Sequence, residues 1–293
     1  MVSDAVQKTV TRGVTRERDA FILMYHHVGS VVRLAGLSPF VVSPGAFRMQ
    51  LDAIQRCGRV VTTLKDLLRE SDSENTLPPR IVITFDDCPA GLADVAIPEL
   101  ERRGLRATFF VVAGKVGGYN DWDVKHGLPR VPLMNWRHLR ELANLGHEIG
   151  SHGFTHRNLR SCLYSQAGAE LSDAKATLQD RLGIPITTVA YPFGEAPDAY
   201  ATLCREAGYV GGCSIFSMSR SVLGDRFMIR RILVSERDVA WRMRIKLSRA
   251  YLRARALLVD GRVLRASGIL PVPEATGSAT RRKDGLIPSA GPE

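Results

Sequence analysis

The sequence predicts an α/β fold built around a parallel β-sheet. Short apolar, β-prone runs alternate with amphipathic segments of helical length from Phe21 onward, and repeated strand–helix units produce a parallel sheet wound in one sense. A chain of 293 residues with 45% hydrophobic and 24% charged side chains is long enough for one large α/β domain or two small ones. From this pattern alone, an open doubly wound sheet and a barrel are both compatible with the chain.

Seven apolar runs are the predicted strands of that sheet, and helix signals lie between them. Ser43 and Pro44 form a favourable N-cap and first helical residue, and Asn135 precedes a second amphipathic segment. Further helices are predicted over residues 165–182 and 197–207. The predicted strands cover residues 21–25, 60–62, 81–85, 107–112, 147–151, 187–191 and 209–213.

The chain divides into four predicted parts. Residues 1–19 are polar, without the apolar segment of a secretory signal, and we expect them to form a flexible leader. Residues 20–239 form the main domain, in which the loop of residues 114–132 is predicted to cover one mouth of the sheet. Residues 240–265 are basic, and residues 266–293 turn to Pro, Gly, Ser and Thr, which predicts a disordered tail.

The cysteines and the apolar runs bear on where in the cell the protein is expected. Five cysteines without a C-x-x-C pair do not form the even framework of a secreted disulfide protein, so a reducing, cytoplasmic location is expected. No apolar run reaches the roughly 18 residues that a membrane-spanning helix needs, so no membrane span is predicted.

The net charge of +10 is concentrated in one segment. Residues 240–265 hold eight Lys or Arg and one Asp, whereas residues 1–239 are nearly balanced, so no specific binding of nucleic acid is expected. Apolar and basic stripes at helical spacing predict an amphipathic helix here. Two interpretations stay open: a closing helix packed on the main domain with a solvated basic face, or an interfacial helix in peripheral contact with an anionic membrane.

Two adjacent carboxylates, Asp86 and Asp87, end the strongest strand signal, Ile-Val-Ile-Thr-Phe-Asp-Asp. Proteins with α/β folds place their functional sites at the carboxyl ends of strands. Because neighbouring residues of an extended chain point to opposite sides, one Asp can coordinate a cation while the other stays uncoordinated and takes a proton. The alternative is an N-cap for the following helix, a position where Asp is common.

Two histidines four residues apart, His152 and His156, follow another short apolar run. They can converge on one ion if they lie on a helical turn. Two imidazoles and one carboxylate leave coordination positions open for water and a substrate oxygen, as a catalytic metal site requires. The alternative is a solvent-facing or core position, but the Asp-Asp strand end before the pair and the Tyr-Pro-Phe-Gly strand end after it favour the metal site.

Together, the three motifs resemble the polysaccharide deacetylases of the nodulation-deacetylase homology group, also called carbohydrate esterase family four. The resemblance covers roughly residues 21–231. It implies an α/β fold of the distorted (β/α)7 barrel type, with residues 20–239 as the deacetylase catalytic domain. It also implies that Asp86 is the general base, and the metal ligands that it implies are Asp87, His152 and His156.

The resemblance also assigns the Pro-Phe-Gly turn to the acetyl pocket. Tyr191 would line this pocket, and the backbone N–H of Phe193 would help to hold the oxyanion. The sequence departs from the family pattern at three positions. Cys88 replaces the usual Gly, Gly153 replaces a Ser or Thr after the first His ligand, and Ala190 stands where many members have an Arg that orients the base.

No histidine follows His156, although these enzymes commonly use a His near the C-terminus as general acid. The Tyr-His-His run at the first predicted strand is similar instead to the circularly permuted branch, such as the poly-N-acetylglucosamine deacetylases. That likeness implies His26 as the acid, with His27 as an alternative acid or a surface imidazole. Arg230 or Arg231 would replace the missing Arg near the base, and a structural ion pair elsewhere is the alternative.

These assignments imply a metal-dependent hydrolase of carbohydrate metabolism that removes N-acetyl groups from an N-acetylhexosamine-containing glycan or glycolipid intermediate. Zinc is expected as the single divalent ion, and cobalt or nickel would also fit two imidazoles and a carboxylate. The alternatives are an amidase acting on a non-sugar C–N bond and an inactive glycan-binding scaffold. The expected partner is an N-acetylated sugar, and the expected location is cytoplasmic, with membrane association if residues 240–265 contact lipid.

Overall fold

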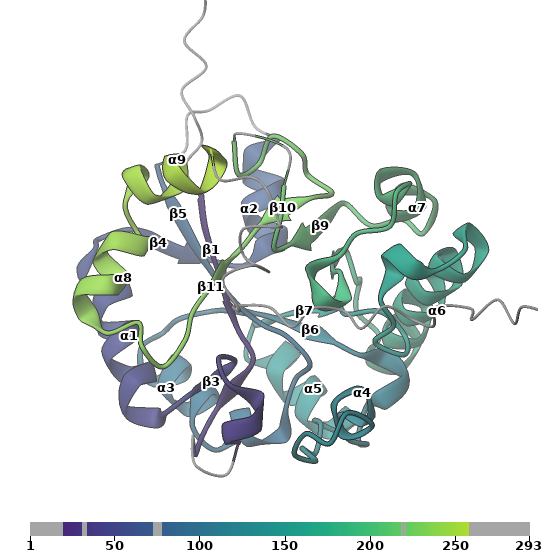
Figure 1. Ribbon diagram of the computed structural model, residues 1–293, viewed down its shortest axis with the longest axis horizontal. Coiled ribbons are helices and arrows are strands. Elements are labelled where there is room, and N and C mark those ends of the chain that lie inside the picture. The colour runs from purple at the N-terminus through teal and green to yellow at the C-terminus, as the bar shows by residue number, and fades with distance from the viewer. Residues whose placement is uncertain (1–19, 31–33, 73–77, 218, 220, 258–293) are drawn as a thin grey trace, which may run out of the picture. The chain divides into compact units, whose positions relative to one another are not determined.

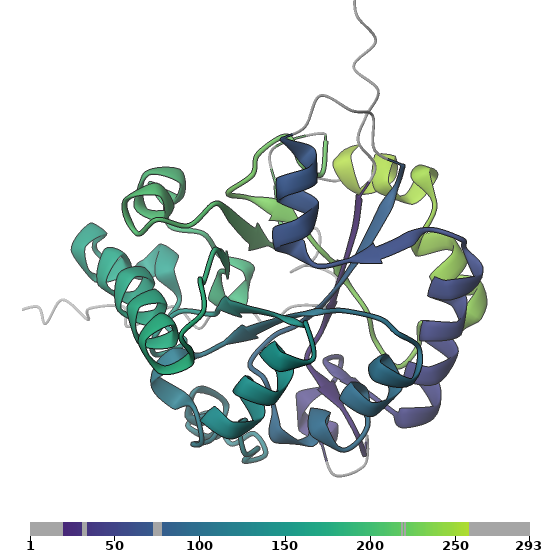
Figure 2. The same cartoon turned by 180° about the vertical axis from the view of Figure 1, so that it is seen from behind.

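Nearly continuous apolar runs produce the strands of a parallel sheet, as strands buried on both faces require. The computed structural model describes residues 20–30, 34–72, 78–217, 219 and 221–257. Within these residues, parallel strands pair in the order β10-β9-β8-β7-β6-β5-β1-β11, with β4 beside β5, and helices surround the sheet (Figures 1 and 2). The predicted barrel-type α/β fold is thereby confirmed.

The seven predicted strands are all present, and four further short strands were not predicted. The bounds are β1 (Ala20–Tyr25), β2 (His27–Val28), β3 (Val41–Val42), β4 (Val60–Thr62), β5 (Arg80–Phe85), β6 (Thr108–Val111), β7 (Glu148–Ser151), β8 (Thr188–Ala190), β9 (Gly211–Ser214), β10 (Ile229–Arg230) and β11 (Ile232–Leu233). Strands β2 and β3 form a separate parallel pair. The unpredicted strands have two residues each, too few for a periodic pattern to reveal.

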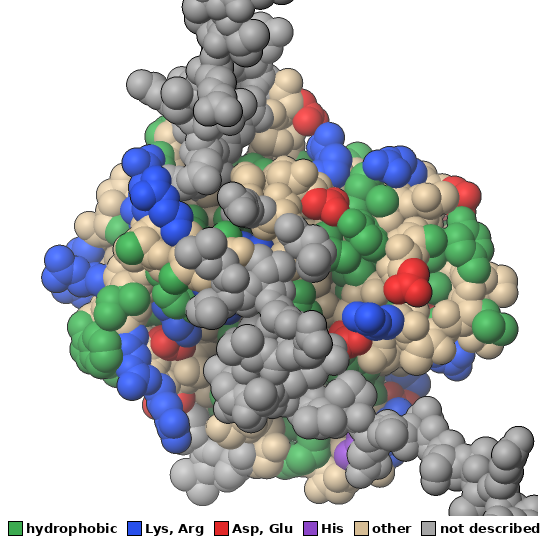
Figure 3. Space-filling model, turned by 45° about the horizontal axis from the view of Figure 1, so that its top comes forward, with side chains coloured by type: hydrophobic (Ala, Val, Ile, Leu, Met, Phe, Trp, Pro, Cys, Tyr) green, Lys and Arg blue, Asp and Glu red, His purple; other side chains and the backbone are tan. Residues whose placement is uncertain are grey.

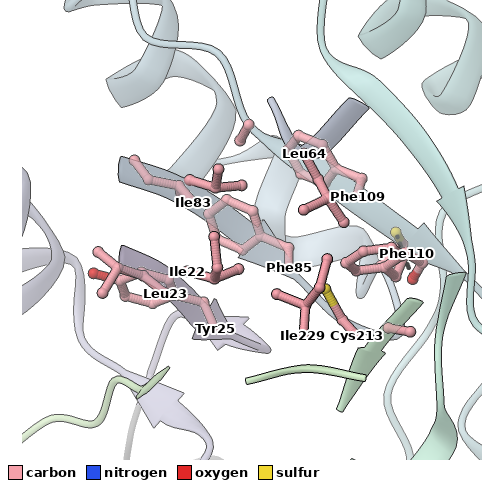
Figure 4. Packing of buried hydrophobic residues seen from close by; sticks show 14 of the residues in the cluster. Ile22, Leu23, Tyr25, Leu64, Ile83, Phe85, Phe109, Phe110, Cys213 and Ile229 are labelled. Carbon is pink, nitrogen blue, oxygen red and sulfur yellow. Dashed lines mark hydrogen bonds between the residues drawn. The ribbon is translucent and has the colours of Figure 1, made fainter. Parts of the chain in front are cut away.

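Strand β5 is the centre of the sheet. It pairs with β1 along its whole length, from Ala20 opposite Arg80 to Tyr25 opposite Phe85. On its other side it pairs first with β4 and then, towards its carboxyl end, with β6. Phe85 stacks on Tyr25 and on Phe109, with ring centroids 5.5 and 4.9 Å apart, and Figure 4 shows this packing. The carboxyl end of β5 is therefore held rigidly by aromatic neighbours on both sides.

The segment of residues 229–233 connects the two ends of the pairing order. Strand β10 pairs with β9, whereas β11 pairs with β1, and Arg231 lies between them. The backbone N–H of Arg231 donates to the carbonyl of Ser214 in β9 at 3.1 Å. The chain thus passes from one edge of the sheet to the other at Arg231, which leaves the barrel nearly closed.

The helices begin where the sequence places its caps. The Ser43 side chain accepts a hydrogen bond from the N–H of Ala46, and the Asn135 side chain accepts one from His138. The helix predicted over residues 165–182 is confirmed. The α-helices are α1 (Pro44–Arg56), α2 (Leu64–Ser71), α3 (Ala96–Arg102), α4 (Asp121–Val124), α5 (Trp136–Asn144), α6 (Tyr164–Leu182), α7 (Tyr200–Glu206), α8 (Ala240–Lys246) and α9 (Arg249–Leu257).

The basic segment is two helices rather than the single predicted one. Helix α8 ends at Lys246, and the Ser248 side chain accepts the N–H of Tyr251, so Ser248 caps a new helix, α9. Residues 258–265, together with the predicted leader of residues 1–19 and the predicted tail of residues 266–293, lie outside the described residues. Within the part of the chain that the structure describes, none of the helices has both the length and the apolar character to cross a bilayer.

Candidate active site

Asp86 and Asp87 lie directly after β5, in a tight turn at its carboxyl end. The N–H of Asp86 donates to the carbonyl of Tyr25, and the N–H of Cys88 donates to the carbonyl of Asp86 at 2.7 Å. Asp87 and Cys88 have φ values of 64° and 55°. This left-handed conformation explains the Gly that the family pattern places at residue 88, because only glycine adopts it without steric cost. The short helix that follows begins after Pro89 without a side-chain cap, so the N-cap alternative for the Asp pair is wrong.

His152 and His156 lie on the loop after β7. They are not on a helical turn, as the spacing rule assumed, because Gly153 and His156 have φ values of 74° and 60°. The carbonyls of Gly153 and Phe154 accept the N–H groups of Ala113 and Gly114 after β6. The backbone reversals within the loop therefore turn both imidazoles towards the end of β5.

Glu170, on α6, organises this loop from behind. Its carboxylate accepts the N–H groups of Phe154 and Thr155 at 2.9 and 2.8 Å and also the Thr155 hydroxyl. Glu170 is 8% exposed and lies on the apolar face of α6 with Ala167 and Ala174. Sequence reasoning missed it, although a carboxylate within an apolar helical stripe is a detectable signal.

Asp87, His152 and His156 converge on one point. Their ligand atoms all lie within 4.8 Å of one another, and all three residues are buried. The Nε2 atoms of His152 and His156 lie 3.5 and 3.2 Å from Asp87 Oδ1. His152 Nδ1 lies 2.8 Å from the carbonyl of Ala190, so Nδ1 carries the proton and Nε2 presents its lone pair to the centre.

These three residues fit a divalent cation. Among the described residues, Asp87 Oδ1 has no hydrogen-bond donor although it is buried, and a buried polar atom without a partner is costly. Burial also raises the pKa of Asp87, although His152 opposes this shift. A bound cation would satisfy the carboxylate and the two imidazole lone pairs together.

Arg231 holds the carboxylate of Asp86, which lies beside this centre. The two guanidinium nitrogens of Arg231 lie 2.6 and 2.7 Å from the two carboxylate oxygens of Asp86, and both side chains are buried. Burial alone would raise the pKa of Asp86, but Arg231, helped by His152 and His26, lowers it well below its usual range.

Arg230 instead donates to the carbonyls of Ser217 and Ser219, so of the two predicted arginines only Arg231 contacts Asp86.

His26 lies beside Asp86 at the end of β1. Its Nε2 is 3.9 Å from Asp86 Oδ2, its side chain is 15% exposed, and it packs against Phe40. Burial lowers the pKa of His26 to about 4, although Asp86 and Asp87 partly oppose this shift. His27 is 4% exposed, in β2, so the surface-imidazole alternative for it is wrong.

Two aromatic side chains flank His156. Trp122, from the loop of residues 114–132, stacks on its ring with centroids 4.1 Å apart. Phe193 meets it edge-on at 4.8 Å and is 44% exposed, with a φ of 59°. The expected loop over the mouth of the sheet therefore contributes Trp122 to the wall of the site, a contact that the sequence did not reveal.

Tyr191 is the predicted site residue that the structure corrects. Its side chain is fully buried, and its hydroxyl donates to the carbonyl of Phe227 at 2.7 Å and contacts Cys204. Its N–H donates to Cys213 in β9. Alternation along the strand directs this side chain into the core, so Tyr191 cannot line the pocket.

Residues 73–212 match the family model described as polysaccharide deacetylase. A putative polysaccharide deacetylase of Bacillus subtilis is 24% identical over 73% of this chain and 71% of its own. A poly-beta-1,6-N-acetyl-D-glucosamine N-deacetylase of Staphylococcus aureus is 23% identical over 75% of this chain and 80% of its own.

Solved structures show the same fold. The Streptococcus pyogenes deacetylase PplD, in complex with acetate, covers 78% of this chain and 98% of its own with a TM-score of 0.67 and 21% identity. IcaB from Ammonifex degensii covers 80% of this chain and 97% of its own with a TM-score of 0.64 and 20% identity.

Proposed function

We propose that the protein is a metal-dependent hydrolase that removes N-acetyl groups from an N-acetylhexosamine-containing glycan, because residues 73–212 match the polysaccharide deacetylase family model. One observation carries this proposal: Asp87, His152 and His156 converge within 4.8 Å, and a second carboxylate, Asp86, lies beside them. This pairing supplies both a cation site and a separate proton acceptor, which hydrolysis of an unreactive amide requires.

The cation would be held by Asp87 Oδ1 and by one ring nitrogen each of His152 and His156. When bound, it would polarise the acetyl carbonyl and lower the pKa of the attacking water. Zinc is the default ion for two imidazoles and one carboxylate, and cobalt or nickel would also fit.

Asp86 is the proposed general base. Both of its oxygens contact Arg231, so the carboxylate stays ionised and its orientation is fixed. Its Oδ2 lies 3.9 Å from His152 Nε2, beside the proposed cation site. In the proposed reaction Asp86 accepts the proton of the water that attacks the acetyl carbon. The backbone N–H of Phe193 is proposed to help hold the oxyanion, since the Phe193 side chain lies at the rim beside His156.

His26 is the proposed general acid. With a pKa lowered to about 4 by burial, His26 is neutral near pH 7 and must gain a proton during turnover. Asp86 Oδ2 lies 3.9 Å from His26 Nε2, so Asp86, after accepting a proton from the attacking water, could pass that proton to His26. His26 would then protonate the departing amine.

The test is release of acetate by the purified full chain. The substrates are β-1,6-linked and β-1,4-linked N-acetylglucosamine oligomers and a non-sugar acetamide, each assayed before chelation, after chelation and after zinc is restored. We expect chelator-sensitive release from at least one oligomer. Release from the acetamide alone would replace the sugar deacetylase with a general amidase, and absence of release from every compound with metal bound would indicate an inactive scaffold.

A further inference from the structure

The outward face of α8 combines exposed apolar and cationic side chains. Trp241 is 59% exposed, and Ile245, one helical turn later, is 51% exposed. Arg242 and Arg244 are exposed on the same helix, and the Arg242 guanidinium lies 5.1 Å from the centroid of the Trp241 ring. Figure 3 shows hydrophobic side chains bordered by Lys and Arg at the left of the molecule, the side on which Figure 1 places α8.

The opposite face of the basic segment holds it on the barrel. Met243 and Leu247 are buried, and Lys246 donates to the carbonyl of Leu233 at 2.6 Å and to Asp238 at 2.7 Å. Arg255, in α9, donates to the backbone carbonyl of Arg231 at 3.1 Å. The packing of α8 therefore uses its inner face, and Trp241 and Ile245 remain outside it.

The acidic side chains of the stretch that contains α8 face inward. Glu236 accepts the N–H and hydroxyl of Ser43, and Asp238 accepts Lys246 and the N–H of Ser235. These two are the acidic residues between positions 234 and 257. On the outward side, residues 234–257 therefore present cations without acidic side chains of their own between them. These exposed cations are Arg237, Arg242, Arg244, Arg249 and Arg253.

We propose that α8 docks the protein on an anionic lipid surface, with Trp241 and Ile245 in the interfacial layer and Arg242 and Arg244 against lipid phosphates. Trp is favoured at the membrane interface, and cations beside an apolar helical face provide electrostatic attraction to anionic lipid. An anionic polymer such as nucleic acid would be recognised by the cations alone and would gain little from an exposed Ile. The combination therefore favours a bilayer.

The experiment measures co-sedimentation of the full chain with vesicles of phosphatidylcholine alone and of equimolar phosphatidylcholine and phosphatidylglycerol. We expect binding to the anionic vesicles only. Each cation near an anionic surface contributes about fivefold to partitioning, so R242Q/R244Q should weaken binding about 25-fold. The W241S/I245S variant should weaken it at least about tenfold through lost apolar burial. Both variants should retain wild-type acetate release from a soluble oligomer.

Matched controls lie on other helices. L163S/Y164S removes two apolar side chains that are 70% and 52% exposed, and R137Q/R140Q removes two exposed cations of α5. Neither should change vesicle binding. The proposal is overturned if the anionic vesicles are not bound, or if both α8 variants bind them like the wild type. It is also overturned if W241S/I245S binds normally while a DNA duplex competes with the vesicles for the same Arg residues.

Discussion

Arg231 and Asp86 contact each other through two parallel N–H···O interactions of 2.6 and 2.7 Å, across 145 residues of sequence. The Arg comes from the point where the chain crosses between the edges of the barrel, and the Asp from the end of the central strand. Arg231 therefore orients the Asp86 carboxylate, a role for which the family pattern has an Arg at the position of Ala190. Because Arg231 lies where the barrel closes, closure of the barrel also places the group that keeps Asp86 ionised.

Replacement of Arg231 by Lys should lower kcat about 100-fold with the metal content unchanged. A Lys ammonium keeps the charge, but it cannot form the two parallel contacts that fix the carboxylate plane. The expected magnitude is that of losing one oriented donor group in an active site. Arg230→Lys is the matched control, because Arg230 contacts Ser217 and Ser219 instead of Asp86. Equal activities for the two variants would contradict the orienting role of Arg231.

The two aspartates should separate in function when each is replaced by Asn. Asp86→Asn should retain bound metal and lose turnover at least about 100-fold, since an amide does not accept the proton of the water. Asp87→Asn should lose metal, because its Oδ1 is the carboxylate atom nearest both imidazoles. Metal content by atomic emission and acetate release distinguish the two outcomes. Metal loss in Asp86→Asn would show that Asp86 is a ligand instead.

Replacing each of the adjacent histidines His26 and His27 by Ala tests which of them is the general acid. His26→Ala should reduce the rate by a factor of about 100 or more and leave the metal content unaltered, because Nε2 of His26 faces Asp86. His27→Ala should affect stability more than rate, since His27 is buried in β2 and forms no ion pair with Asp86 among the described contacts. The acid is misassigned if the rate falls only in His27→Ala.

The candidate metal site could be predicted from sequence because each of its three residues lies in a short motif at a strand end. The parallel order of their strands brings the ends of β5 and β7 to one edge of the sheet, although the loop conformation that turns His152 and His156 towards Asp87 is not predicted by the spacing. The sequence left two candidates, Arg230 and Arg231, for the partner of Asp86. Arg231 lies between β10 and β11, and strands of two residues each are too short for a pattern to place. The prediction for Tyr191 is wrong because the motif does not reveal that this residue, paired with Cys213 just beyond β8, directs its side chain into the core.

Glu170 was missed for a different reason than Tyr191. Its role depends on a loop conformation with left-handed residues, Gly153 and His156, which no periodic pattern predicts. The pattern of the basic segment likewise predicts one helix, because a stripe at helical spacing runs past the Ser248 cap. Periodicity identifies faces of elements, but caps and loop geometry decide where those elements end.

Glu170→Gln should weaken metal affinity about 10- to 100-fold, the usual effect of removing support behind metal ligands. The isosteric amide keeps the volume but loses one acceptor for the loop of residues 152–156. Competition with a zinc chelator measures the affinity directly. Asp173→Asn, on the exposed face of α6, is the control and should bind metal as the wild type does. Unchanged affinity in Glu170→Gln would show that the loop does not need the carboxylate.

Stability should rise with pH between about 4 and 6.5, in part because of His27. Burial lowers the pKa of His27 to about 4, whereas an imidazole in the unfolded chain titrates near 6.5. Between these values the unfolded state binds the additional proton, so the free energy of unfolding increases with pH.

The stabilising contribution of a neutral His27 is complete above pH 6.5 and is lost as the pH falls towards 4, at most about 3 kcal/mol. Urea denaturation of the metal-free protein across this interval measures the slope, and His27→Gln should flatten it because Gln does not titrate. Identical slopes for His27→Gln and the wild type would contradict a neutral, buried His27.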